Sequence, residues 1–291
     1  MKKLNFSLFL SAIVCQSTPI PLSTLRLNGS AQLISSSVLR LTPNYDLPGD
    51  PPAGSAWLPN TINVAQGFSV NFQFQLTNLS GEPDPDDGSG ADGFAFVIQN
   101  DPRGASTLGA GAGGLGYMYI WNSLAVEFDT YKNLPWYGDP NGNHISVHSR
   151  GPDFNVPHHR CINGLYRSSP TGYTDLPHTP CSSDPDLGSA SLLPFLLTDG
   201  NLHSATISYT PGLLQISLDS SVNLLSVPVN LPSLLNLENG THAWIGFTAG
   251  ARAGFQNHDI LSLDVSVVPE PAHLSWLGLL ALLGLRACRS Q

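Results

Sequence analysis

The sequence FSVNFQFQL, residues 68–76, alternates apolar and polar side chains without a break. A period of two over nine residues predicts a β-strand with one buried face. Other short apolar runs follow along the chain between turns rich in Gly and Pro, and none has a convincing helical period. They cover residues 25–41 (a first pair of strands around Asn28-Gly29), 94–98, 205–209, 213–218, 244–248 and 260–267. This spacing predicts an all-β fold, an antiparallel β-sandwich.

Composition limits the partners of this chain. It has 291 residues, 41% hydrophobic and only 11% charged, and its formal net charge is −9. Such a chain can fill the core of one large domain, which we place at residues 20–267. A negative chain cannot neutralise a row of phosphates, so we expect no nucleic-acid partner.

The first residues are typical of a secretory signal. Met1-Lys2-Lys3 precedes an apolar run over residues 6–14, which predicts a signal peptide at 1–17 with cleavage near Ser17. The alternative is that this run forms the first element of the fold.

The last residues, 268–291, also have the composition of a sorting segment. Val268-Pro269-Glu270-Pro271 precedes an apolar run of about 14 residues and a basic end. As a helix this run spans roughly 21 Å, less than the ~30 Å hydrocarbon core of a membrane. The segment resembles the PEP-CTERM signal of bacterial exported proteins. That resemblance implies exosortase-type processing, transient membrane association through this segment, and a location at the cell surface, outer membrane or extracellular matrix.

Two cysteines lie outside both terminal segments. Cys161 and Cys181 belong to a long stretch, residues 150–191, that is too long for an ordinary connection. In an exported domain an even pair favours a disulfide, and a metal-thiolate pair is the alternative.

An acidic stretch, EFDTYKN at residues 127–133, stands out in a chain poor in charge, and Asp139 and His144 follow it. If residues 126–131 form a strand, Glu127, Asp129 and Tyr131 share one face at intervals of about 6.6 Å. Neighbouring carboxylates repel each other unless a cation lies between them. The pattern therefore favours a hard divalent cation, with a transition metal beside it at His144. The alternative is an acidic strand facing solvent.

Five motifs in this order resemble the L-type (legume-like) lectins. They are Ala91-Asp92-Gly93, Gly113-Gly114-Leu115-Gly116, residues 127–133, Asp139 with His144-Ile145, and His258-Asp259-Ile260-Leu261-Ser262. The resemblance implies a concanavalin-like jelly-roll sandwich that binds glycans or polysaccharide without modifying them. It also implies a cis peptide bond between Ala91 and Asp92.

The same resemblance implies two metal ions, Ca²⁺ and a transition metal that is usually Mn²⁺. The implied Ca²⁺ ligands are Asp129, Tyr131 through its carbonyl, Asn133 and Asp139. The implied transition-metal ligands are Glu127, Asp129, Asp139 and His144. The implied carbohydrate contacts are Asp92, the Gly113 amide and Asn133, with backbone groups of a late loop that we place at Ala251 and Arg252.

Two features depart from the family pattern. An aromatic that stacks on the sugar is not obvious, and Trp136 or Tyr137 either serves or merely packs. The stretch 150–191 is an addition. His158, His159 and His178 within it are expected to be solvated loop residues, and an extra metal site is the alternative.

Two other classes of function compete with a lectin. A glycoside hydrolase on the same sandwich needs two carboxyl groups about 5–5.5 Å apart. Tyr131 and Lys132 stand where laminarinase-like enzymes carry the second Glu, so we expect no enzyme activity. A structural surface or matrix protein with a vestigial sugar site is the other alternative.

Overall fold

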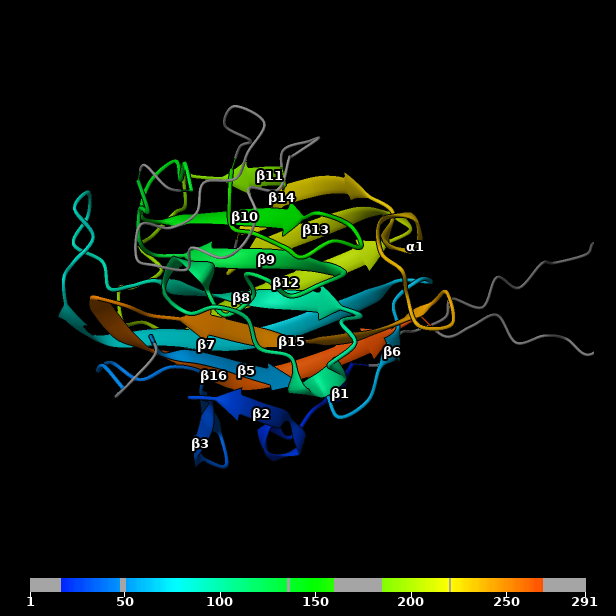
Figure 1. Ribbon diagram of the computed structural model, residues 1–291, viewed down its shortest axis with the longest axis horizontal. Coiled ribbons are helices and arrows are strands. Elements are labelled where there is room, and N and C mark those ends of the chain that lie inside the picture. The colour runs from blue at the N-terminus through cyan, green and yellow to red at the C-terminus, as the bar shows by residue number, and fades with distance from the viewer. Residues whose placement is uncertain (1–16, 48–50, 135–136, 160–184, 220, 269–291) are drawn as a thin grey trace, which may run out of the picture.

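The computed structural model describes residues 17–47, 51–134, 137–159, 185–219 and 221–268. These residues form a sandwich of two antiparallel eight-stranded sheets, shown in Figure 1. The expected all-β sandwich is confirmed. The predictions for Cys161, Cys181, most of the signal segment and nearly all of the C-terminal segment lie outside the described residues.

The first sheet runs in the order β14-β13-β12-β7-β16-β4-β3, and β1 pairs with β16. Its strands are β1 (Thr18–Pro19), β3 (Gln32–Ser35), β4 (Val38–Arg40), β7 (Phe68–Gly81), β12 (His203–Thr210), β13 (Gly212–Leu218), β14 (Ser221–Val229) and β16 (Gly254–Val267). The longest pairing joins β7, the alternating strand of the sequence, to β16.

The second sheet runs in the order β11-β10-β9-β8-β15-β5-β2, and β6 pairs with β15. Its strands are β2 (Arg26–Gly29), β5 (Ala53–Trp57), β6 (Ile62–Asn63), β8 (Gly93–Gln99), β9 (Ser123–Asp129), β10 (His144–Ser149), β11 (Asp186–Ala190) and β15 (His242–Gly250). A short helix, α1 (Leu231–Leu234), and 3₁₀ turns at Leu22–Thr24, Gly104–Ser106 and Ala112–Gly114 complete the described elements. Among these residues no helix has the length and apolar character needed to cross a membrane.

The core lies between the sheets and is built from phenylalanines. Phe72 and Phe74 of β7 are almost fully buried, and the ring of Phe74 lies 5.0 Å from that of Phe94 and 5.5 Å from that of Phe128. Phe94 and Phe128 stack at 4.6 Å within the second sheet. Burying each such ring contributes on the order of 2 kcal/mol.

A second, smaller apolar cluster covers the outer face of β8 and β9. It comprises Trp57, Ala95, Val97, Leu115, Tyr117, Ile120 and Ala125. Side chains alternate along a strand, so Phe128 faces the core while Glu127 and Asp129 face this outer side. The Gly-rich segment before β9 therefore packs over the same face that carries the acidic side chains.

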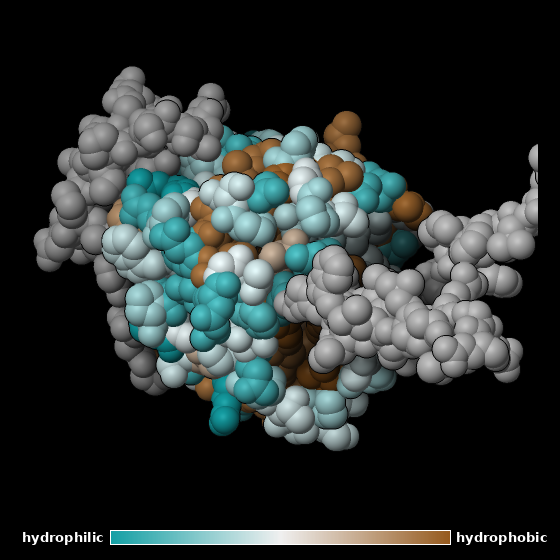
Figure 2. Space-filling model, turned by 90° about the vertical axis from the view of Figure 1, so that its right-hand side faces the viewer, coloured by the Kyte–Doolittle hydropathy of each residue, from teal (hydrophilic) through white to brown (hydrophobic). Residues whose placement is uncertain are grey.

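Two details of the expected strands were wrong. The strands on either side of Asn28-Gly29 are not a pair, because β2 joins β5 in the second sheet and β3 joins β4 in the first. β9 ends at Asp129, so Tyr131 lies beyond it. Hydrophilic and hydrophobic side chains are interspersed at the end of the sandwich that Figure 2 shows.

Candidate functional site

Two neighbouring strands and the loop between them bring the acidic side chains together. In the register of β9 and β10, His144 lies opposite Asp129 and Ser146 lies opposite Glu127. Paired residues share a face, so these side chains converge on the outer side of the sheet. One ligand atom each from Glu127, Asp129 and His144 lies within 4.8 Å of the others. Asp139, from the loop before β10, is grouped likewise with His144 and His159. We call Glu127, Asp129, Asp139 and His144 the acidic cluster.

Glu127 is buried and is held by three hydrogen-bond donors. Its Oε2 accepts from the Tyr117 hydroxyl at 2.8 Å, and its Oε1 accepts from Ser146 Oγ at 3.0 Å. Its Oε1 also lies 2.8 Å from His148 Nε2. Burial by itself raises the pKa of Glu127, but the charge of His148 and the histidine hydrogen bonds outweigh it and hold the pKa well below its usual value. Glu127 is therefore an ionised carboxylate.

Asp129 and Asp139 crowd each other in a buried site. Burial raises the pKa of Asp129 well above its usual value, and the charges of Asp139 and Glu127 raise it further. Burial likewise raises the pKa of Asp139 to about 6, with the charge of Glu127 adding to the shift. Carboxylates that repel in this way are stabilised in the ionised form by a divalent cation. The donor set therefore fits the metal ions that the sequence implied.

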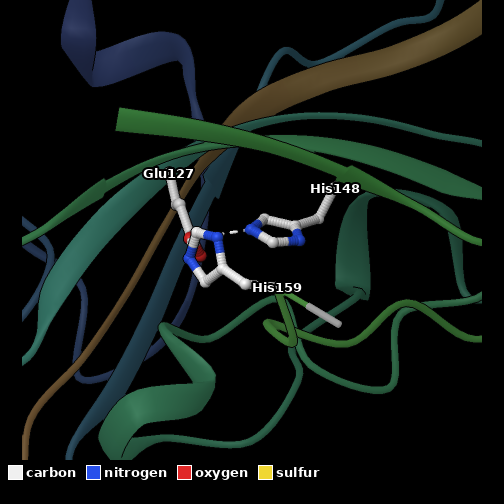
Figure 3. Close-up of side chains that lie close together, drawn as sticks. All are labelled: Glu127, His148 and His159. Atoms are coloured by element: carbon white, nitrogen blue, oxygen red, sulfur yellow. Dashed lines mark hydrogen bonds and ion pairs between the residues drawn. The ribbon is translucent and has the colours of Figure 1, made fainter. Parts of the chain in front are cut away.

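His159 belongs to this site, so the expectation of a solvated loop residue was wrong. Its Nε2 lies 3.0 Å from His144 Nε2, 3.5 Å from Glu127 Oε1 and 3.7 Å from Asp139 Oδ1. Figure 3 shows its ring approaching Glu127 and His148 from a loop, while those two residues extend from strands. Burial lowers the pKa of His159, but hydrogen bonds to Asp186 and Glu127 overcome this and raise it to about 10.

His158 is also buried, with 2% of its surface exposed. Its ring packs edge-on against Tyr137 at 4.9 Å, and burial lowers its pKa to about 4. His178 lies outside the described residues. No periodic pattern in the sequence marked His158 or His159, because their positions depend on how the loop after β10 packs back onto the sheet.

Beside Asp129 and Asp139 lies a set of oxygens suited to Ca²⁺. Asp129 Oδ1 accepts a hydrogen bond from the Tyr131 amide at 2.8 Å, and Asp139 Oδ2 accepts from the Asn133 amide at 2.6 Å. Asn133 Oδ1 is buried and has no hydrogen-bond partner among the described residues. Buried acceptors are normally satisfied, so an orphaned carbonyl oxygen next to two carboxylates fits a cation ligand.

A pocket of about 540 Å³ opens next to these oxygens. Asp92, Gly113, Asn133 and Arg252 all line it, so four of the five predicted carbohydrate contacts come together. The fifth, Ala251, does not line the pocket: its side chain is buried and its amide donates to the Pro52 carbonyl.

Asp92 is aimed into this pocket by its backbone. The Ala91–Asp92 peptide bond is cis, as the resemblance implied. The Asp92 amide donates to the Gly250 carbonyl, and the Asp92 carbonyl accepts from the Thr130 amide. Asp92 Oδ1 accepts from Asn133 Nδ2 at 3.4 Å, whereas Oδ2 is buried without a partner in the described structure. Burial raises the pKa of Asp92 to about 8. The carboxylate thus lacks the hydrogen bonds that a bound hydroxyl would supply.

Gly113 packs so closely against Asn133 and Tyr137 that there is no room for a side chain. A Cβ at this position would lie 2.6 Å from Tyr137 Cε2 and 2.7 Å from Asn133 Oδ1. Tyr137 itself is buried and its hydroxyl lies 3.8 Å from Met118 Sδ, so its ring packs behind the pocket as part of the wall. Trp136 lies outside the described residues.

Comparison with known proteins agrees with this arrangement. The family model described as the legume lectin domain matches residues 5–276, and the chain belongs to this family. It is 29% identical over 240 residues to a probable L-type lectin-domain containing receptor kinase, S.7, from Arabidopsis thaliana, an alignment covering 77% of this chain and 30% of that protein. It is 35% identical over 97 residues to bark agglutinin I polypeptide B from Robinia pseudoacacia, covering 31% of this chain and 30% of that one. The chain thus spans about 30% of the length of the curated relatives it matches.

Solved structures share the fold. Lectin I from Ulex europaeus, in complex with the methyl glycoside of α-L-fucose, superposes with a TM-score of 0.60 at 18% identity, covering 86% of this chain and 97% of that chain. The exoplasmic/lumenal domain of VIP36, in a Ca²⁺/Man3GlcNAc-bound form, superposes with a TM-score of 0.55 at 18% identity and covers 86% of each chain.

Proposed function

We propose that this protein is a lectin that binds a glycan in the pocket at Asp92, Gly113 and Asn133 without modifying it. The observation that carries the proposal is a pair of buried, unsatisfied oxygens, Asp92 Oδ2 and Asn133 Oδ1. They lie on residues that line one pocket, beside a cluster suited to metal ions. Buried polar atoms without partners cost about 1–3 kcal/mol each, and both a ligand and a cation would remove that cost.

Each group has a role that its chemistry supports. Asp92 Oδ2 would accept a hydrogen bond from a sugar hydroxyl. Asn133 Nδ2 and the Gly113 amide would donate to sugar oxygens. Family membership and the fucose and Man3GlcNAc complexes of structural neighbours support a glycan as the ligand.

We propose further that binding depends on two metal ions. Asp129, the Tyr131 carbonyl, Asn133 and Asp139 would hold Ca²⁺, and the acidic cluster would hold a transition metal such as Mn²⁺. The ions supply fixed positive charge. That charge would fix Asp139, which accepts a hydrogen bond from the Asn133 amide, and so keep Asn133 against Asp92.

Hydrolysis is the less favoured function at this site. A retaining hydrolase needs one carboxyl that donates a proton and another that attacks the sugar. Glu127 is ionised, and its carboxylate accepts three hydrogen bonds, from Tyr117, Ser146 and His148. It does not line the pocket, so it is placed to bind a metal ion rather than to reach a bound sugar.

We also propose that the chain is exported. The support is the sequence alone: residues 1–17 as a signal peptide, 268–291 as a PEP-CTERM-like sorting segment, and the lectin domain at 20–267 between them. The partners would then be a surface or matrix polysaccharide and an exosortase-type processing system. Fractionation of cells that express the full chain tests this, and a chain that stays uncleaved in the cytoplasm would contradict it.

An array of immobilised oligosaccharides tests the binding proposal directly. The full chain should bind in the presence of CaCl₂ and MnCl₂, and Asp92→Asn should weaken that binding at least tenfold. Asp264→Asn, on β16, is the matched control because Asp264 does not line the pocket. Undiminished binding by Asp92→Asn would contradict the proposed site. Release of reducing sugar that Glu127→Gln abolishes would favour the hydrolase.

A further inference from the structure

We propose that His159 is an additional ligand of the transition-metal ion, and that it increases the preference of the site for Zn²⁺, Co²⁺ or Ni²⁺ over Mn²⁺. The observation is the close approach of two imidazole nitrogens, His159 Nε2 and His144 Nε2, at 3.0 Å. Asp139 belongs to the same group of converging ligand atoms. This inference rests on the metal part of the proposed function and does not require that the pocket bind sugar.

The hydrogen bonds at the far side of each ring decide where its proton lies. His144 Nδ1 is 2.9 Å from the Asn141 carbonyl, and His159 Nδ1 is 3.1 Å from an Asp186 carboxylate oxygen. Both partners can only accept, so each Nδ1 carries the hydrogen. A metal ion binds only the unprotonated nitrogen of an imidazole. With each hydrogen held at Nδ1, both Nε2 atoms are the nitrogens that can bind, and they lie 3.0 Å apart, close enough to share one ion.

Metal-binding histidines show this same arrangement. A ligating ring normally donates its second N–H to a carboxylate or a backbone carbonyl, which fixes the tautomer and the ring orientation. His159 has the carboxylate partner and His144 has the carbonyl partner. Asp186, at the start of β11, is therefore a positioning residue for His159.

Glu127 completes the set, and its position is also fixed. Its Oε1 is 3.5 Å from both His144 Nε2 and His159 Nε2. The hydrogen bond from His148 holds that oxygen in place, as Figure 3 shows. The side chains of Glu127, Asp139, His144 and His159 are 8% exposed or less, so bulk water is largely excluded.

The second imidazole changes which ion fits. Carboxylate and water ligands suit Mn²⁺, whereas imidazole nitrogens suit Zn²⁺ and its neighbours. A site with one histidine and three carboxylates is close to the carboxylate-rich set that suits Mn²⁺. With His159 added, two imidazoles stand beside the three carboxylates of Glu127, Asp129 and Asp139, and the larger share of nitrogen ligands favours Zn²⁺, Co²⁺ or Ni²⁺.

Calorimetric titration of the full, chelator-stripped chain tests the proposal. ZnCl₂ and MnCl₂ are titrated separately with CaCl₂ present throughout. His159→Ala should weaken Zn²⁺ binding by about 100-fold while changing Mn²⁺ binding less than about threefold, and Asp186→Asn should weaken Zn²⁺ binding by roughly 10-fold. His242→Ala, at the start of β15, should change neither affinity. Equal losses for both ions, or no loss for Zn²⁺, would overturn the proposal.

A second readout needs no substitution. In the Co²⁺-loaded wild-type chain, each ligating ring shows one strongly shifted, exchangeable N–H proton in the NMR spectrum. Two such protons are expected, from His144 and His159, and a single one would overturn the proposal. Glycan binding by the metal-loaded wild-type chain is scored separately, so failure of the sugar pocket and failure of this ligand set are distinguishable.

Discussion

Asn133 Nδ2 donates a hydrogen bond to Asp92 Oδ1, and the amide of the same Asn133 donates to Asp139 Oδ2. One residue therefore connects the pocket to the acidic cluster. A cation that fixes Asp139 also fixes Asn133, and through it the position of Asp92. In the proposed lectin, this connection is the physical reason why an ion that does not touch the glycan would control glycan binding.

Adding a methyl group at Gly113 should weaken glycan binding while leaving the fold intact. In Gly113→Ala the new methyl would lie 2.7 Å from Asn133 Oδ1 and 2.6 Å from the Tyr137 ring, so both must shift. Glycan affinity should fall at least tenfold. Isothermal titration with a glycan that the array identifies measures this.

The control for that variant is Gly240→Ala. Gly240 has a φ of +75°, and a methyl group added to it would have no described atom within 4 Å. Alanine there costs about 1 kcal/mol of stability through its backbone conformation, without touching the pocket. The variant should be less stable and still bind glycan. If Gly113→Ala binds as well as Gly240→Ala, the pocket is wrongly placed.

Removing metal should destabilise the domain. Ions present at 100 times their Kd stabilise a protein by about 2.7 kcal/mol per site. A domain of this size shifts its Tm by about 2–4 °C per kcal/mol, so loss of one ion should lower Tm by roughly 5–10 °C and loss of both by roughly 10–20 °C. Differential scanning calorimetry measures the shift.

EDTA that has been saturated with CaCl₂ and MnCl₂ beforehand serves as the control and should leave Tm unchanged. Restoring CaCl₂ and ZnCl₂ to the stripped chain should recover the original Tm. If EDTA leaves the Tm of the chain unchanged, the chain holds no tightly bound metal ion and the prediction is wrong.

Acid should destabilise the fold through His258, which is fully buried. Burial, and then the charge of Arg40, lower its pKa from 6.5 to about 3. Gln256 Nε2 lies 3.1 Å from its Nε2, which therefore accepts, and Arg40 is paired with Asp259. The unfolded chain binds a proton below pH 6.5 and the folded chain does not. Stability from this residue is thus complete above pH 6.5 and falls by about 1.4 kcal/mol per pH unit down to about pH 3.

Urea unfolding between pH 7.5 and 4, with EDTA present throughout, isolates this effect from metal release. His258→Gln retains a polar side chain but cannot titrate, so its stability should depend less steeply on pH than that of the wild type. Parallel pH profiles for the two chains would refute the assignment.

The sequence was informative wherever the signal was local. Alternation in residues 68–76 predicted β7, and the order of five motifs predicted how Asp92, Gly113 and Asn133 meet in one pocket. The first prediction succeeds because a period of two is a property of one short segment. The second was implied by the resemblance to the L-type lectins, whose members share the long-range packing that brings these motifs together.

The predictions that were wrong concern features that depend on contacts between residues far apart in the sequence. The separation of β2 from β3 depends on which sheet edge each one reaches, and no local pattern encodes that choice. His159 was misjudged for the same reason. It is a loop residue by sequence, and only the return of the chain across β9 and β10 buries it against Glu127.

The hydrogen bond between His159 and Asp186 has a further consequence for the length of the chain between them. It ties together the residues on either side of the stretch 160–184, while β11 pairs with β10 immediately afterwards. The two ends of the stretch are therefore fixed by the sandwich itself. Doubling the length of a connection between two fixed points costs only about 0.6 kcal/mol in closure entropy. A change in the number of residues between His159 and Asp186 therefore costs little in closure entropy.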